Sequence, residues 1–136
     1  MGGLRNHLCR LILGLTLVFQ AATTSAQTNP SDPLYRFATC TGRLSAMVEH
    51  QWLMSDPKSD ATAALRDDMV QLMDAAMADG QAQQAMAWRL EAKVAAAALL
   101  RRAAFGQDPA LARWSQRRAV ELVDGCRAII LAGGGA

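Results

Sequence analysis

The stretch LYRFATCTGRLSAMVEHQWLM, residues 34–54, decides the fold, because its apolar side chains recur with the period of an α-helix. One side of the helical wheel gathers Phe37, Cys40, Thr41, Leu44, Met47, Val48 and Trp52. The opposite side carries Thr39, Arg43, Ala46, Glu49 and His50. The pattern predicts an amphipathic helix whose buried side holds Cys40.

The first 26 residues have the three-part layout of a secretory signal peptide. Basic residues precede the apolar run LILGLTLVF at 11–19, and the small residues Thr24 and Ala26 stand at the −3 and −1 positions of a cleavage site. The run is too short to cross a bilayer, which needs about 20 residues. We therefore expect residues 1–26 to be removed, no transmembrane segment in the mature chain, and a periplasmic or secreted location in a bacterium.

The charge balance changes when this segment is left out. The whole chain has 14 basic and 12 acidic residues, a formal net charge of +2. Arg5 and Arg10 belong to the first segment, so the mature chain has 12 residues of each sign. A neutral mature chain gives no support for nucleic-acid binding. Its first half, 27–80, is acidic and its second half, 81–136, is basic, which predicts a dipolar surface.

Three Asp-Pro pairs predict helix starts, at Asp32-Pro33, Asp56-Pro57 and Asp108-Pro109. The carboxylate of an N-cap Asp accepts hydrogen bonds from the first turn, and Pro suits the first helical position. Asp79-Gly80 predicts a break, since Gly is typical just past a helix end. The predicted helices span 33–55, 57–79, 82–105 and 109–132. They follow a flexible leader at 27–32, form one domain at 33–132 and precede a flexible tail at 133–136.

Cys40 and Cys126 are the only cysteines of the mature chain. Similar helix lengths and short connections favour an antiparallel up-down-up-down four-helix bundle, in which the first helix starts where the last one ends. Cys40 lies about 10 Å from that end and Cys126 about 9 Å, so the two heights agree. Exported proteins also keep disulfides. We therefore predict an all-α bundle that is closed by a Cys40–Cys126 disulfide.

The predicted helix 82–105 has two apolar sides. The side with the appearance of a core face carries Met86, Leu90, Val94, Ala97 and Ala104. The opposite side carries Trp88, Ala92, Ala95, Leu99 and Ala103. Because a bundle helix normally has one apolar face, we expect Trp88, Ala92, Ala95 and Leu99 to bind an unknown protein partner or a second copy. The alternative is that the alanines only favour helix formation.

Sequence motifs for catalysis are absent from the mature chain. His50 is its only histidine, so neither a histidine pair nor a zinc motif can form. It also has no CxxC or CxxCH motif, no glycine-rich phosphate loop and no GxSxG. We expect neither an enzyme nor a bound cofactor, and instead a protein-interaction or structural role that includes self-association through helix 82–105.

A metal site is the alternative function. Met47, His50 and Met54 fall within about 60° on the predicted helix, and thioether with imidazole suits Cu(I). The competing interpretation is that the methionines fill gaps in the core and that His50 lies on the surface. The alternative is therefore a periplasmic bundle that binds a metal or another small ligand.

Overall fold

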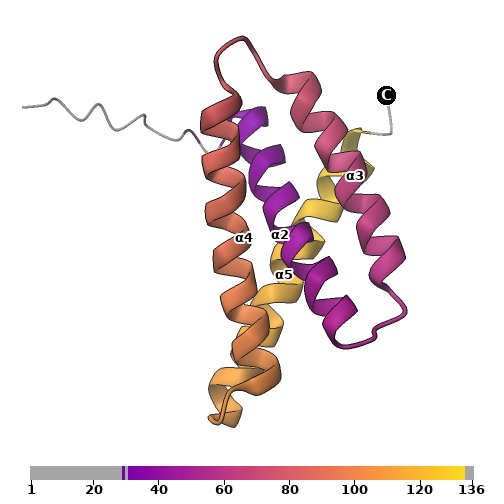
Figure 1. Cartoon of the computed structure of the whole chain (residues 1–136), viewed down its shortest axis with the longest axis vertical. Helices are drawn as coiled ribbons and strands as arrows, with labels where there is room; N and C mark the ends of the chain where they lie inside the picture. Colours follow the sequence, from indigo (N-terminus) through magenta and orange to yellow (C-terminus); the bar gives the residue numbers. More distant parts are fainter. Residues whose placement is uncertain (1–28, 30, 134–136) are drawn as a thin grey trace, which may run out of the picture.

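The computed structural model describes residue 29 and residues 31–133 of the chain. Within this part there are four helices and no strand: α2 (Pro33–Leu53), α3 (Ser59–Ala76), α4 (Ala82–Phe105) and α5 (Pro109–Gly133) (Figure 1). The prediction of an all-α protein is confirmed. None of these helices has the length and hydropathy that crossing a bilayer requires. The expected signal peptide and residues 134–136 of the expected tail lie outside the described residues.

Two of the three Asp-Pro pairs start helices as predicted. At the start of α2, the Asp32 carboxylate accepts a hydrogen bond from the Leu34 N–H at 3.0 Å. At the start of α5, the Asp108 carboxylate accepts two, from the N–H groups of Ala110 at 2.8 Å and Leu111 at 3.1 Å. These bonds satisfy backbone donors that have no partner within the helix.

The third pair does not start a helix directly. Asp56 accepts a hydrogen bond from the Lys58 N–H at 2.9 Å, but this bond closes a turn, and α3 begins only at Ser59. Lys58 precedes the first helical residue and makes no side-chain cap. Gly80 has a φ of +80°, so the predicted break between α3 and α4 is confirmed, in a backbone conformation that favours glycine.

The helix α2 lies at the centre of the molecule. It packs against α3 on one side and α4 on the other, while no Cα atom of α3 comes within 8 Å of one of α4 (Figure 1). The helix α5 packs mainly on α4 and crosses α2. In a regular four-helix bundle each helix contacts its sequence neighbour. The missing α3–α4 contact is therefore a departure from the predicted bundle.

Three clusters of buried side chains follow α2 along its length. The first consists of Leu34, Ala38, Met73, Ala85 and Trp88. The second consists of Cys40, Leu44, Met69, Val123 and Cys126. The third consists of Ala46, Ala96, Leu100 and Ala119. Because α2 contributes to all three, its position determines where each of the other helices can pack.

The central position of α2 widens its buried side beyond the predicted one. Thr39 and Ala46 were expected to face outward and are buried, because α3, α4 and α5 together surround most of the helix. The hydroxyl groups of the buried Thr39, Thr41 and Ser45 donate to backbone carbonyls four residues earlier, at 2.7–2.9 Å, so they need no other partner. Trp52, in the last turn, was expected to be buried and is exposed.

The contact between α2 and α4 brings two backbones close together at Gly42. A Cβ atom on Gly42 would overlap the Arg89 carbonyl oxygen and would lie 2.9 Å from the Lys93 backbone nitrogen. Ala38 and Ala46, one turn to either side of Gly42, are also buried in this contact. Small residues four positions apart therefore let α4 lie directly against α2.

Replacement of Gly42 by alanine tests this contact. We expect Gly42→Ala to lower the free energy of unfolding by about 3 kcal/mol, at the upper end of the range for overpacking, because a rigid backbone has to move. Gly125→Ala is the matched control, since Gly125 is also helical and no heavy atom lies within 4 Å of its added Cβ. That substitution should stabilise by about 0.5–1 kcal/mol. Urea denaturation of both variants measures the difference, and equal effects would contradict the contact.

Candidate functional site

The predicted Cys40–Cys126 disulfide is confirmed. The two Cα atoms are 5.5 Å apart and the two sulfur atoms 2.04 Å apart, and the cysteines are 86 positions apart in the sequence. Both residues are buried, and Leu44, Met69 and Val123 surround them. The bond joins the first described helix to the last. It also leaves the described chain without a free thiol, because Cys40 and Cys126 are its only cysteines.

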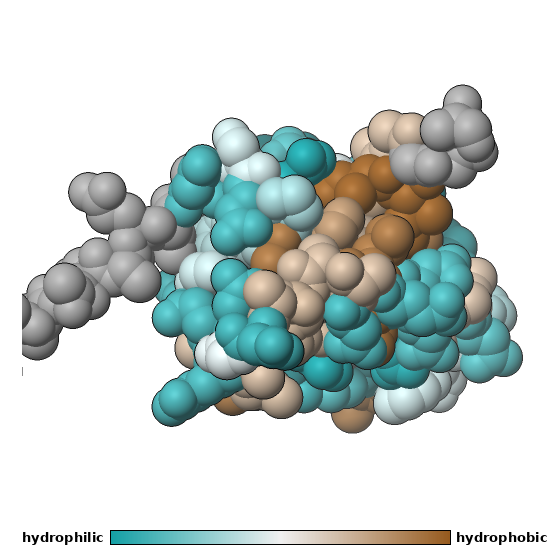
Figure 2. Space-filling model, turned by 90° about the horizontal axis from the view of Figure 1, so that it is seen from above, coloured by the Kyte–Doolittle hydropathy of each residue, from teal (hydrophilic) through white to brown (hydrophobic). Residues whose placement is uncertain are grey.

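An apolar surface lies near the end of α5. Figure 2 views the molecule from this end and shows a hydrophobic area beside the C-terminal residues. Ile129 and Ile130 pack partly against the disulfide cluster, while Leu131 is exposed. The last turns of α5 are therefore buried on one side and exposed on the other.

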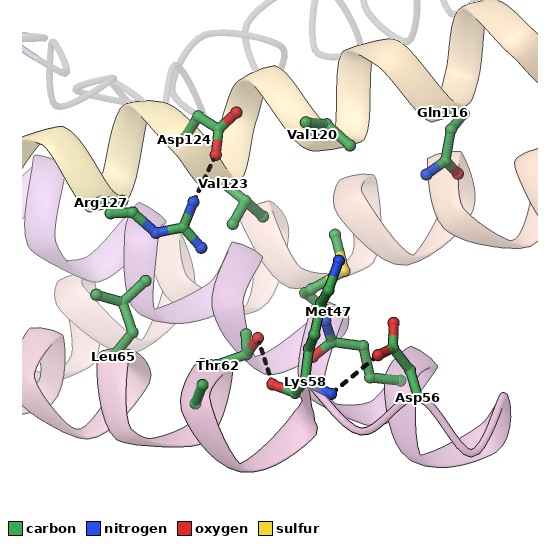
Figure 3. Close-up of a pocket in the computed structure, with 12 residues that line it drawn as sticks. Met47, Asp56, Lys58, Thr62, Leu65, Gln116, Val120, Val123, Asp124 and Arg127 are labelled. Atoms are coloured by element: carbon green, nitrogen blue, oxygen red, sulfur yellow. Dashed lines mark hydrogen bonds and ion pairs between the residues drawn. The ribbon is translucent and has the colours of Figure 1, made fainter.

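The larger of the two cavities lies between α2, α3 and α5 and has a volume of about 480 Å³ (Figure 3). Its apolar wall includes Met47, Leu65, Val120 and Val123. Its charged lining residues are Asp56, Lys58, Asp124 and Arg127. The cavity exists because α3 and α5 approach each other only slightly. One part of its lining is therefore apolar, and the other part carries equal numbers of acidic and basic residues.

The charged groups of this cavity are only partly paired. Arg127 donates from Nη1 to Oδ1 of Asp124 at 2.8 Å, and both side chains are half exposed. One oxygen of Asp56 accepts the Lys58 backbone N–H. No carboxylate of the described residues lies within 4 Å of the Lys58 ammonium group, which Figure 3 shows extending into the cavity. Lys58 is thus the cation here that can bind an added anion without breaking an ion pair.

A buried amide lines the same cavity. Gln51 is only 7% exposed, and its Oε1 atom has no hydrogen-bond partner among the described residues. A buried acceptor without a partner destabilises a fold by about 1–3 kcal/mol. The hydroxyl of Ser115 is also buried without a partner among the described residues, but Ser115 lines neither this cavity nor the one between α2 and α4. Gln51 is therefore the unsatisfied polar side chain in the wall of this cavity.

Sequence reasoning missed Gln51, although a signal was present. On the helical wheel Gln51 falls between Leu44, Met47 and Val48, in the middle of the apolar side. A polar side chain in that position requires a hydrogen-bond partner, either within the protein or on a bound molecule.

The smaller cavity, of about 280 Å³, lies between α2 and α4. Its lining includes His50, Leu53, Leu100, Arg101 and Phe105. Close to it, the Lys93 ammonium group and the Glu49 carboxylate form an ion pair at 2.6 Å. The cavity is mainly apolar and lies at the end of α4 that leads into α5.

The structure does not bring the proposed metal ligands together. Met47 lines the larger cavity and His50 lines the smaller cavity, so the two side chains lie on different sides of α2. Met54 follows the last residue of α2 and is exposed. Within the described part of the chain, no three His, Cys, Asp or Glu side chains converge on a point that could hold a metal ion. Copper binding stays a prediction without a shared site.

The side of α4 that packs against α2 lies between the two apolar sides that were expected. Trp88, expected to bind a partner, is 9% exposed, and its ring stacks edge-on against Tyr35 with the centroids 5.2 Å apart. Ala92 and Leu99 are half-buried, and Ala95 alone of the expected interaction side is exposed. The expectation that these four residues face a partner therefore does not fit the buried position of Trp88.

The expected core side of α4 faces outward instead. Met86, Leu90 and Val94 are all exposed. The physical reason is the close contact at Gly42, which meets the backbone of α4 at Arg89 and Lys93. The small residues Ala85 and Ala96, about one turn or more to either side of this contact, are both buried. The periodicity of the sequence indicated two apolar sides of α4. It did not indicate which side can pack closely against α2.

Arg43 lies partly buried on α2. Burial lowers the pKa of its guanidinium group below the usual value; the nearby Tyr35 raises this pKa and Arg118 lowers it further. Arginine starts so far above neutral pH that Arg43 stays charged under physiological conditions. This environment does not resemble that of a catalytic acid or base.

The fold and its cavities define a small helical protein in which one disulfide joins the first and last described helices. Comparisons with protein-family models, with curated proteins and with solved structures find no match for the chain. Its function therefore has to be argued from its own residues.

Removal of the disulfide should weaken the fold strongly. We expect the double variant Cys40→Ala/Cys126→Ala to lose about 4 kcal/mol of unfolding free energy, because the bond closes a long loop of the unfolded chain. Urea denaturation measures the loss, and wild type treated with dithiothreitol is the control that should match the variant. Reaction of denatured, unreduced mature protein with a maleimide should add no mass. Labelling of both cysteines would contradict the bond.

Proposed function

We propose that the mature chain is an exported, non-enzymatic protein of the periplasm or the extracellular space, an up-down-up-down helical bundle in which two copies pair through α4. The pairing surface is the row of side chains formed by Met86, Leu90, Val94 and Phe105, here called the α4 stripe. The observation that carries the proposal is that this whole row is exposed, although α4 is already buried on its other side.

The α4 stripe runs along one side of the helix, with the exposed Arg101 between Val94 and Phe105. Its four side chains are 49%, 52%, 69% and 60% exposed in chain order. At 100° per residue they fall within an arc of about 100°, and they extend over about 28 Å. Leu53, at the end of α2, lines the smaller cavity together with Phe105 and adds to the apolar surface at that end.

A surface of this kind favours a protein partner. A helix that packs on one side normally presents polar residues on the other, whereas α4 is apolar on both sides. Contiguous exposed apolar surface on a small protein is typical of an interaction site. Each Å² removed from water contributes about 25 cal/mol. Burial of the α4 stripe against another helix is therefore a favourable way to complete this structure.

The charges beside the α4 stripe favour a second copy in antiparallel orientation. Glu91 lies beside the first half of the stripe, and Arg101 and Arg102 lie in its second half. If two α4 helices cross midway between Met86 and Phe105, Glu91 of each copy approaches Arg101 of the other. A parallel pair would instead place the arginines of both copies together. Opposite charges across an interface fix orientation and partner choice.

The smaller cavity supports the same arrangement. In the antiparallel pair, Met86 of one copy meets Phe105 of the other, beside the cavity that Leu53, Leu100 and Phe105 line. Its volume of about 280 Å³ is sufficient for an unbranched methionine side chain. Methionine adapts readily to such irregular apolar spaces.

The disulfide supports the location. Disulfides persist in oxidising compartments such as the periplasm and the extracellular space. The confirmed Cys40–Cys126 bond is compatible with export, which the sequence of residues 1–26 favours independently.

Charged substitutions in the α4 stripe test the pairing. We expect mature wild-type protein to sediment as a dimer at concentrations where Leu90→Glu/Val94→Glu is a monomer, because each carboxylate would have to be desolvated in the pair. Leu111→Glu is the matched control, since Leu111 is an exposed apolar residue on α5 and its replacement should leave the mass unchanged. Sedimentation velocity provides the measurement. A wild type that stays monomeric at all concentrations would remove the proposal.

A charge exchange tests the antiparallel orientation. Glu91→Lys should weaken the dimer by about 0.5–1 kcal/mol for each of the two exposed contacts. The double variant Glu91→Lys/Arg101→Glu should restore it, because the pair of charges is regenerated with opposite signs. Dissociation constants from concentration-dependent sedimentation give the comparison. Failure of the second substitution to restore affinity would argue against the antiparallel crossing while leaving dimerisation itself intact.

A further inference from the structure

We propose that the cavity between α2, α3 and α5 binds a small zwitterion of the amino-acid type that carries an apolar side chain. This site is separate from the pairing surface, because none of its lining residues belongs to α4. The inference therefore goes beyond the proposed function and does not depend on it.

The size and lining of the cavity fit such a ligand. Its volume of about 480 Å³ lies within the range of small-molecule sites. Two acidic and two basic residues line it, so their formal charges cancel. A neutral zwitterion adds no net charge to this lining, whereas a simple anion or cation would.

The carboxylate end of the ligand has two partners. Lys58 extends its ammonium group into the cavity, and no carboxylate of the described residues pairs with it (Figure 3). Lys58 also precedes the first turn of α3, which has no side-chain cap. Backbone N–H groups of an uncapped first turn bind anions well. Ala61 of this turn lines the cavity, whereas the Thr62 N–H already donates to the Lys58 carbonyl oxygen at 3.0 Å.

The ammonium end of the ligand has acceptors close to Lys58 in the chain. Gln51 lines the cavity, and its buried Oε1 atom lacks a partner among the described residues, so a small shift of this side chain would offer the oxygen to a ligand that donates a hydrogen bond. Asp56 lines the same cavity and supplies a negative charge. A charged donor between these two oxygens would satisfy the one buried acceptor that the fold leaves unpaired at this site.

The remaining part of the cavity suits an aliphatic side chain. Leu65 of α3 and Val120 and Val123 of α5 face it from two helices. Arg127 and Asp124 are already bonded to each other at 2.8 Å, so they close this side without requiring a charged ligand. The three types of lining together correspond to carboxylate, ammonium and alkyl groups on one small molecule.

Three probes separate the contributions of these groups. Isothermal titration calorimetry of oxidised mature protein would compare L-leucine with isocaproate, which lacks the ammonium group, and with isoamylamine, which lacks the carboxylate. We expect L-leucine to bind about tenfold or more tightly than either analogue. Equal affinities for L-leucine and one analogue, or no heat from L-leucine at millimolar concentration, would overturn the proposal.

Two variants connect binding to the named residues. Lys58→Gln should weaken L-leucine binding by about tenfold, and Lys93→Gln, which removes the same charge from α4, should leave it unchanged. Gln51→Met should weaken binding while the urea midpoint stays the same or rises, because an apolar side chain of similar length replaces a buried unpaired acceptor. A Gln51→Met variant with lower stability and unchanged affinity would overturn the assignment.

The pairing variant Leu90→Glu/Val94→Glu distinguishes this proposal from the previous one. It should bind L-leucine with unchanged affinity, because Leu90 and Val94 lie on α4 and not in the cavity. Loss of L-leucine binding in that monomeric variant would contradict a site that is complete within one chain.

Discussion

The backbone contact at Gly42 is the constraint on which the rest of this structure depends. A glycine at this position lets the carbonyl oxygen of Arg89 occupy the space that a Cβ atom would take. Only the small-residue side of α4 can approach so closely, and it therefore turns toward α2. Two helices at this separation gain many weak dispersion contacts, which together are large. The orientation of α4 follows from this contact rather than from the hydrophobicity of its two sides.

The exposure of the α4 stripe is a direct consequence. Once Trp88 packs against Tyr35 and the alanines lie against α2, Met86 and Leu90 are left about half exposed. No other described helix covers them, because α3 packs on the far side of α2 and α5 approaches α4 elsewhere. A helix that packs on one side normally presents polar residues on the other. The proposed pairing of two copies would cover this second apolar side.

The sequence was sufficient for features that depend on local chemistry. Asp32 and Asp108 act through their own first turns, so their capping role is visible without the fold. The Cys40–Cys126 pair was also predictable, because helix lengths alone bring the two cysteines to the same height. The start of α3 was not, since the Asp56 carboxylate forms a turn with Lys58 instead of a helix cap. Helix caps and short turns use the same hydrogen bonds, and the sequence does not distinguish them.

Features that depend on packing between helices were beyond the sequence. A wheel shows that Gln51 shares a side with Leu44 and Met47, but it does not show that α3 and α5 diverge and leave a cavity there. The divergence has its own cause: the disulfide holds α5 against α2, while α3 packs on a different side of the same helix. A central α2 thus explains both unsatisfied features, the exposed α4 stripe and the unpaired Gln51 acceptor. Sequences usually violate local rules at functional positions, and these two violations lie on different helices, which is why a separate occupant is proposed for each.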